Sequence, residues 1–230
     1  MSNAINNFLF FGAVISILGY EAGIRLNRRF KLAIFNPLLI SILIVMAFLS
    51  VFHINYEAYN GSAKYISYLL TPATICLAVP LYRQLELLKK HSRAIIAGTI
   101  TGVLTTMVTV FLLALIFGLN HQQYVTFLPK SITTAIAMGI SEEMKGLVTI
   151  TVACIIVTGI LGSMVAETVC KICKITDPVA KGIAIGSAAH AVGTTKAMEM
   201  GEIEGAMSSL AIATSGLCTV IFASIFANFI

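Results

Sequence analysis

Lys130 stands among hydroxyl side chains in an otherwise apolar part of the chain. Ser131 follows it directly, and Thr133 and Thr134 come shortly after. A cation at membrane depth costs about 2.5–3.5 kcal/mol even on permissive scales, so it is commonly functional. The pattern predicts that Lys130 neutralises a small carboxylate and that the hydroxyls orient it. The alternative is that Lys130 snorkels to the interface, because Pro129 begins the segment.

His190 belongs to a second polar cluster, in a run of Gly, Ala and Ser that gives an imidazole no packing role. Gly193, Thr194, Thr195 and Lys196 follow within six residues. A His donates, accepts or carries a proton near neutral pH, so it could bond the substrate or move a coupled proton. A structural His that bonds a neighbouring carbonyl is an equal alternative. For Lys196, a marker of the membrane boundary is slightly favoured over an anion ligand.

Thr71 and Thr74 flank Pro72 and could complete the same cavity. More often, hydroxyls beside a helix-breaking Pro bond the carbonyls that it frees. Cys170 and Cys173 have metal-ligand spacing, but no second pair completes four ligands. We find no convincing nucleophile–base pair and no phosphate-binding loop, so we expect neither an enzyme nor a cofactor or metal site.

The composition predicts that most of the chain lies in a bilayer. Hydrophobic residues make up 58% of it and charged residues 11%, against about 45–50% and 25% in soluble domains. A spanning helix needs about 20 apolar residues. Six uncharged runs meet or approach that length: Ser2–Tyr20, Leu32–Phe52, Tyr65–Tyr82, Ala94–Pro129, Gly146–Ala166 and Gly205–Ile230. We therefore predict an all-α, polytopic integral membrane protein with one transmembrane domain over residues 1–230.

Basic residues cluster between these runs, at residues 25–31, 83–93 and 171–181. Such clusters mark cytoplasmic loops, so the net charge of +5 is expected to set orientation. This places the N-terminus outside and makes the polar loop His53–Lys64 external. The basic residues form no aromatic-interleaved stripe, which excludes nucleic-acid binding.

The runs predict about six spans, near residues 5–26, 32–52, 65–88, 94–118, 146–169 and 205–230. The third contains two prolines, Pro72 and Pro80, and is expected to be interrupted. Leu128–Glu143 and Gly182–Glu199 are too polar and too short for lipid-facing spans. We predict that both are interrupted or re-entrant, because non-helical backbone at membrane depth survives only inside protein or beside water. A re-entrant second segment leaves the C-terminus outside, and a spanning one leaves it inside.

A shift of 57 residues aligns parts of the chain with one another. Pro72 then falls on Pro129, and Glu86 on Glu143. The topology would make the last two units inverted repeats, an arrangement typical of secondary transporters in which two broken elements bind substrate at the midplane. Chance matches are frequent in so apolar a chain, so the repeat and its absence are about equally favoured.

Three stretches resemble the LrgB/CidB family of bacterial membrane proteins, and the resemblance covers nearly the whole chain. They are Pro72–Thr74 with Ala78–Tyr82, Pro129–Thr134, and Gly186–Glu199 with Gly205-Ala206 after it. The family often has Ala-Arg where Thr195-Lys196 stands, which keeps the cation and puts the fine selectivity in doubt.

The resemblance implies the bacterial cytoplasmic (inner) membrane, a holin-like LrgA/CidA-type partner, and two competing functions. One is antiholin-like regulation of murein hydrolase export and autolysis. The other is movement of small carboxylates such as pyruvate or glycolate, as in a related plastidial glycolate/glycerate translocator. The cationic, hydroxyl-rich segments favour the carrier, and we expect a homo-oligomer. An oligomeric pore stays open, because Ala94–Gly118 carries Thr99, Thr101, Thr105 and Thr109.

Overall fold

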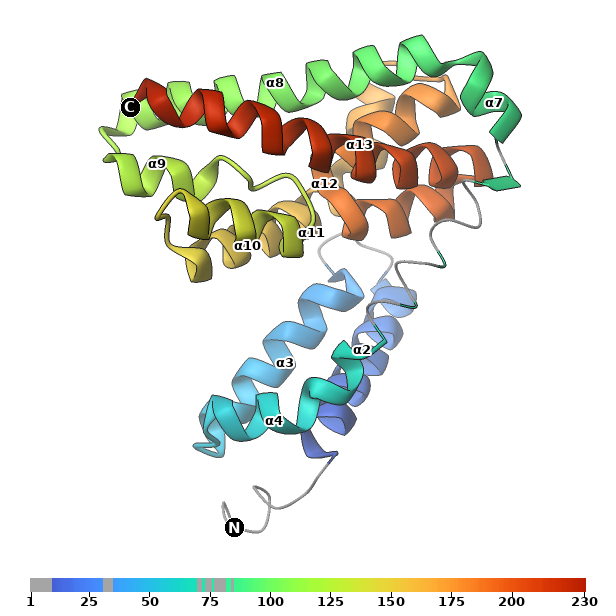
Figure 1. The fold of residues 1–230 in the computed structure, drawn as a ribbon. Coiled ribbons are helices and arrows are strands. Elements are labelled where there is room, and N and C mark those ends of the chain that lie inside the picture. The colour runs from blue at the N-terminus through green and yellow to red at the C-terminus, as the bar shows by residue number, and fades with distance from the viewer. Residues whose placement is uncertain (1–9, 31–34, 70–71, 73–75, 77–81, 84) are drawn as a thin grey trace. The chain divides into compact units, whose positions relative to one another are not determined.

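The computed structural model describes residues 10–30, 35–69, 72, 76, 82–83 and 85–230. Every regular element in these ranges is a helix (Figure 1), as the composition predicts. Three described helices are long and apolar enough to cross a membrane: Ser92–Phe117, Val148–Ile172 and Glu202–Phe229. The count of about six spans stays a prediction. The chain divides into two compact units, Met1–Cys76 and Leu77–Ile230, and the expectation of one transmembrane domain also stays a prediction.

The described residues of the N-terminal unit form α2 (Phe11–Phe30), α3 (Pro37–Val51) and α4 (Tyr56–Ser67). Asn36 caps α3, because its side chain accepts the Leu38 N–H at 2.9 Å and Pro37 opens the first turn. Helix α2 approaches α4 closely, so that the Gly12 N–H donates to the Ser62 hydroxyl at 2.8 Å. A Cβ at position 12 would lie 2.5 Å from the Tyr59 carbonyl oxygen, which only a glycine avoids.

Two sequence predictions need correction in this unit. Helix α2 continues to Phe30, past the predicted end near Leu26. The loop predicted at His53–Lys64 is wrong over most of its length, because α4 begins at Tyr56, and its external position stays a prediction. The Asn55 side chain caps α4 by accepting the Glu57 N–H at 3.1 Å, a start signal that the sequence already carried. Thr71, Thr74 and Pro80 lie outside the described residues, as do residues 70, 73, 75, 77–79, 81 and 84 of the expected third span.

The second unit positions the candidate site. Its elements are α7 (Leu85–Lys90), α8 (Ser92–Phe117), α9 (His121–Phe127), α10 (Thr134–Glu143), α11 (Val148–Ile172), α12 (Pro178–Met200), α13 (Glu202–Phe226) and the 3-10 turn η2 (Ala227–Phe229). Helices α8, α11 and α13 occupy the spans predicted near 94–118, 146–169 and 205–230. Their core includes the fully buried side chains of Met107, Tyr124 and Ile155.

The first interrupted segment is a helical hairpin, formed by α9, the non-helical residues 128–133 and α10. Its two arms return to the same end. The Gln122 amide donates to the Lys145 carbonyl at 3.2 Å, so the start of α9 lies beside the residue that follows α10. The interruption predicted within Leu128–Glu143 is therefore present, although the hairpin begins earlier, at His121.

The second interrupted segment is also a hairpin, formed by the two halves of α12. The helix breaks at His190, whose φ of 41° and ψ of −138° are not helical. A continuous helix would separate Lys181 and Met198 by about 25 Å, at 1.5 Å per residue. Instead, Lys181 pairs with Glu204 at 4.0 Å, and Met198 contacts the neighbouring Gly205. The chain therefore enters and leaves this hairpin at one end.

The two hairpins open toward opposite ends of the second unit. The first opens beside the C-terminus, where His121 Nδ1 lies 2.7 Å from the Ile230 carbonyl oxygen. The second opens beside the start of α8, where Gly98 packs against Ile183. Helices α8 and α13 run from the second open end to the first, and α11 runs back (Figure 1). The hairpin tips therefore point toward each other, and the internal repeat itself stays a prediction.

Candidate functional site

The two hairpins meet at one small cavity. The break of the first hairpin contributes three residues, and Ser187 comes from the second hairpin, three residues before its break. Helices α8 and α13 complete the wall. The full lining is Val103, Thr106, Met107, Leu128, Ser131, Ile132, Ser187 and Thr219. The space suits about one water molecule, and four hydroxyl groups line it. The structure thus joins the two broken segments that the sequence singled out.

Lys130 is the cation closest to this cavity along the chain. Its side chain is half-buried, and its ammonium donates to the Ser131 hydroxyl at 3.1 Å. Within the described ranges, no carboxylate lies within 4 Å of Lys130. The ion pairs found among the described residues of the second unit all join a Lys to a Glu, and none of them includes Lys130. Lys130 therefore holds a positive charge that has no carboxylate partner among the residues that the structure describes.

The start of α10 faces the same break. Thr133 is the N-cap residue, but its side chain makes no capping hydrogen bond to the helix. Thr134 begins the first turn, whose backbone N–H groups have no partner within the helix. Such groups and the helix dipole favour an anion. Thr133 and Thr134 are half-buried and do not line the cavity.

His190 lies at the tip of the second hairpin but does not line the cavity. Its Nε2 lies 3.0 Å from the Ile155 carbonyl oxygen of α11. Because a carbonyl only accepts, Nε2 carries the proton and Nδ1 is left as an acceptor. The ring rests on Gly159, where a Cβ would lie 2.6 Å from Cε1. This contact matches the structural alternative for His190, and its role toward a substrate stays a prediction.

The residues that follow the break at His190 make packing and hydrogen-bond contacts that stabilise the second hairpin. Gly193 packs against Ile185, where a Cβ would lie 3.0 Å from Cγ2. The fully buried Thr194 hydroxyl donates to the His190 carbonyl at 3.0 Å and lies 2.7 Å from the Ser208 hydroxyl of α13. Thr195 is exposed, and its hydroxyl donates to a carbonyl one turn back. None of these three predicted ligands lines the cavity.

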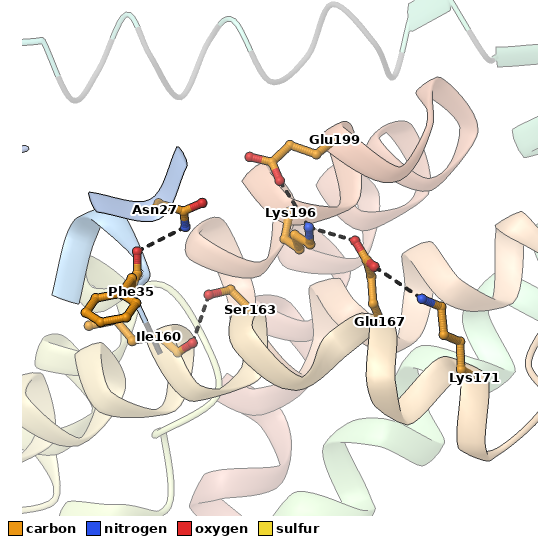
Figure 2. Close-up of polar contacts among 8 residues, drawn as sticks. All are labelled: Asn27, Phe35, Ile160, Ser163, Glu167, Lys171, Lys196 and Glu199. Atoms are coloured by element: carbon orange, nitrogen blue, oxygen red, sulfur yellow. Dashed lines mark hydrogen bonds and ion pairs between the residues drawn. The ribbon is translucent and has the colours of Figure 1, made fainter. Parts of the chain in front are cut away.

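Lys196 lies at the open end of the second hairpin and is fully paired (Figure 2). Its ammonium is 2.7 Å from Glu167 of α11 and 3.2 Å from Glu199. Glu167 also contacts Lys171 at 3.7 Å. These pairs tie the returning arm of α12 to α11. Lys196 differs from Lys130 in having two carboxylate partners, and its role as a boundary residue or an anion ligand stays a prediction.

A buried hydroxyl cluster, absent from the sequence predictions, holds the first hairpin. The Thr126 hydroxyl accepts the Leu147 N–H at 2.8 Å, and the Thr126 carbonyl accepts the Thr151 hydroxyl at 2.9 Å. Ser141 bonds Thr151 at 2.8 Å. The cluster ties α9, α10 and α11 together and so fixes the break. Thr106, Ser187 and Thr219 were also missed, because nothing in the local sequence shows which hydroxyl of a helix faces the cavity.

The family model described as the LrgB-like family matches residues 16–229. Two relatives are named antiholin-like protein LrgB, one from Bacillus cereus (strain B4264) and one from Bacillus anthracis (strain CDC 684 / NRRL 3495). Each is 36% identical over 222 residues, covering 96% of this chain and 96% of the relative. No solved structure matches the chain.

Proposed function

This chain belongs to the LrgB-like family, and we propose that it is an antiholin-like membrane protein that works through a small-anion site between two broken helices. The names of the relatives support the antiholin-like function. The resemblance to bacterial membrane proteins supports the cytoplasmic membrane as the location. In this proposal, the binding of a small anion changes the antiholin-like activity of the protein.

The proposal of an anion site depends mainly on the surroundings of Lys130. Lys130 is half-buried, has no carboxylate partner within the described ranges, and contacts a hydroxyl that lines the shared cavity. An uncompensated ammonium at membrane depth is costly unless a ligand or water supplies counter-charge or solvation. The uncapped first turn of α10 adds backbone donors at the same break. A small carboxylate fits this set of donors.

The second candidate function is a carrier of small carboxylates such as pyruvate or glycolate. The opposed hairpins favour it, because carriers bind substrate where broken helices from two sides meet. The relatives' names support the antiholin-like function more directly than they support transport. The two functions share the anion site and differ in whether the anion crosses the membrane.

The arrangement in the membrane follows from charge. Lys89 and Lys90 precede α8, and Lys171 and Lys181 lie near the open end of the second hairpin, so these basic residues gather at one end. The positive-inside rule makes that end cytoplasmic. The second hairpin is then re-entrant from the cytoplasm, the first from outside, and the C-terminus is outside. We retain about six spans and inverted repeats as part of this proposal.

We further propose an LrgA/CidA-type membrane partner and assembly as a homo-oligomer, both implied by the family resemblance. The proposed activity involves neither nucleic acid nor an enzymatic reaction.

The test reconstitutes the full chain, with and without the partner, in liposomes and measures binding and uptake of labelled pyruvate. Saturable uptake that Lys130→Gln removes supports the carrier. Saturable binding without uptake, together with an autolysis phenotype that Lys130→Gln changes in cells, supports the antiholin-like function. Absence of both binding and uptake, with the partner present, overturns the anion site.

A further inference from the structure

We infer that the Ser215 hydroxyl of α13 forms a hydrogen bond with a second oxygen of the bound acid. This contact would determine which small acids the site prefers. This inference rests on the proposed anion site at Lys130 and adds a residue of α13 that lies one helical turn from the lining residue Thr219. It was not among the residues that the sequence singled out.

Ser215 differs from the neighbouring hydroxyls of α13. It is 1% exposed, and its Oγ is the buried side-chain atom that lacks any hydrogen-bond partner within the described ranges. By contrast, Ser209, Thr214 and Ser224 each donate to a carbonyl one turn back, at 2.9, 3.0 and 3.1 Å. Buried hydroxyls are almost always paired, so an unpaired one calls for a ligand or water.

Ser215 is not itself part of the cavity lining, and it lies on α13 between Ala211, which packs on the second hairpin, and Thr219, which lines the cavity. Thr219 follows four residues later on the same helical face, about 5–6 Å away between Cβ atoms, and lines the cavity. Ala211 precedes it by one turn and packs against Gly186, where a Cβ would lie 2.8 Å away.

The two walls suit the two ends of a small acid. Lys130 and Ser131 belong to the first hairpin and offer donors to a carboxylate. The hydroxyls of Thr219 and Ser215 belong to α13 and can donate or accept, so they suit a keto or hydroxyl oxygen. Because the cavity has room for about one water molecule, the acid enters when the hairpins move apart.

The experiment compares displacement of labelled pyruvate by unlabelled pyruvate and by propionate, which lacks the keto oxygen. The full-length protein in detergent or liposomes is used, with Ser215→Ala and the matched control Ser209→Ala. We expect Ser215→Ala to reduce the preference for pyruvate over propionate by about 3- to 10-fold, the loss of one hydrogen bond. Ser209→Ala should leave the preference unchanged.

Thermal unfolding without ligand separates this role from a structural one. Removing an unpaired buried hydroxyl should raise the Tm, whereas removing a structural one lowers it. An unchanged preference in Ser215→Ala, or a lower Tm, overturns the inference even if Lys130→Gln abolishes pyruvate binding. If the unsubstituted protein binds no pyruvate, the anion site itself fails.

Discussion

Replacement of Lys130 by Gln should weaken binding of a small carboxylate without destabilising the protein. In the unsubstituted protein the Lys130 ammonium lies 3.1 Å from the Ser131 hydroxyl. Gln keeps most of the side-chain length and can still donate to that hydroxyl. What is lost is the positive charge. Because Lys130 has no carboxylate partner within the described ranges, no acidic group of those ranges is left unpaired by the change.

The magnitude follows from the single contact that is removed. A hydrogen bond to a charged group contributes about 1.5–3 kcal/mol, which corresponds to roughly a 10- to 150-fold rise in Kd. In the proposed membrane arrangement, removing a cation that has no carboxylate partner within the described ranges should leave the Tm unchanged or raise it. Radioligand binding of pyruvate and thermal unfolding in the same detergent measure both quantities.

Lys196→Gln is the matched control, because Lys196 has the same side chain and two carboxylate partners. Its loss leaves Glu167 near Lys171 and 43% exposed, so the stability cost should stay below about 1 kcal/mol. Pyruvate binding should change less than threefold. The reasoning is refuted if Lys130→Gln binds pyruvate within twofold of the unsubstituted protein while Lys196→Gln loses binding.

The packing of the hairpins gives three further predictions, each measured by chemical or thermal unfolding. Gly182→Ala should destabilise, because its Cβ would lie 2.5 Å from a carbonyl oxygen of α13, whereas Gly139→Ala, with open space around it, should stabilise by about 0.5–1 kcal/mol. His190→Gly should be more stable than His190→Ala, because its φ of 41° strains any side chain by about 1–3 kcal/mol; equal stabilities would contradict this. Thr126→Val should cost about 1–3 kcal/mol by removing the acceptor of the Leu147 N–H, and a neutral change would argue against the hydroxyl cluster.

The helical class and the two interruptions could be predicted because each follows from local composition. Uncharged apolar runs mark α8, α11 and α13, and polar stretches mark the hairpins, the second of them rich in glycine. The same reasoning misplaced the loop at His53–Lys64, because overall polarity outweighed the capping signal of Asn55, on which α4 begins. Polarity along a chain does not distinguish an exposed loop from an amphipathic helix.

The long-range partners of the candidate residues could not be predicted from local patterns. Glu199 lies three residues after Lys196, but only the fold brings Glu167 to Lys196 and no carboxylate of the described ranges to Lys130. Likewise, Ser187 and Thr219 reach the cavity of Ser131 through helix packing alone. Local patterns identified where the backbone breaks, and long-range packing determines which side chains lie next to each break.

The account depends most on the meeting of the two hairpin tips, which cross-linking tests directly. Ser131→Cys combined with Ser187→Cys, with the five native cysteines replaced, places one thiol on each hairpin at the shared cavity. We predict that an oxidant or a short bifunctional reagent links them in native membranes and that pyruvate slows the reaction. Absence of the cross-link, in a doubly substituted protein that remains folded, would contradict the convergence of the hairpins and with it the anion site.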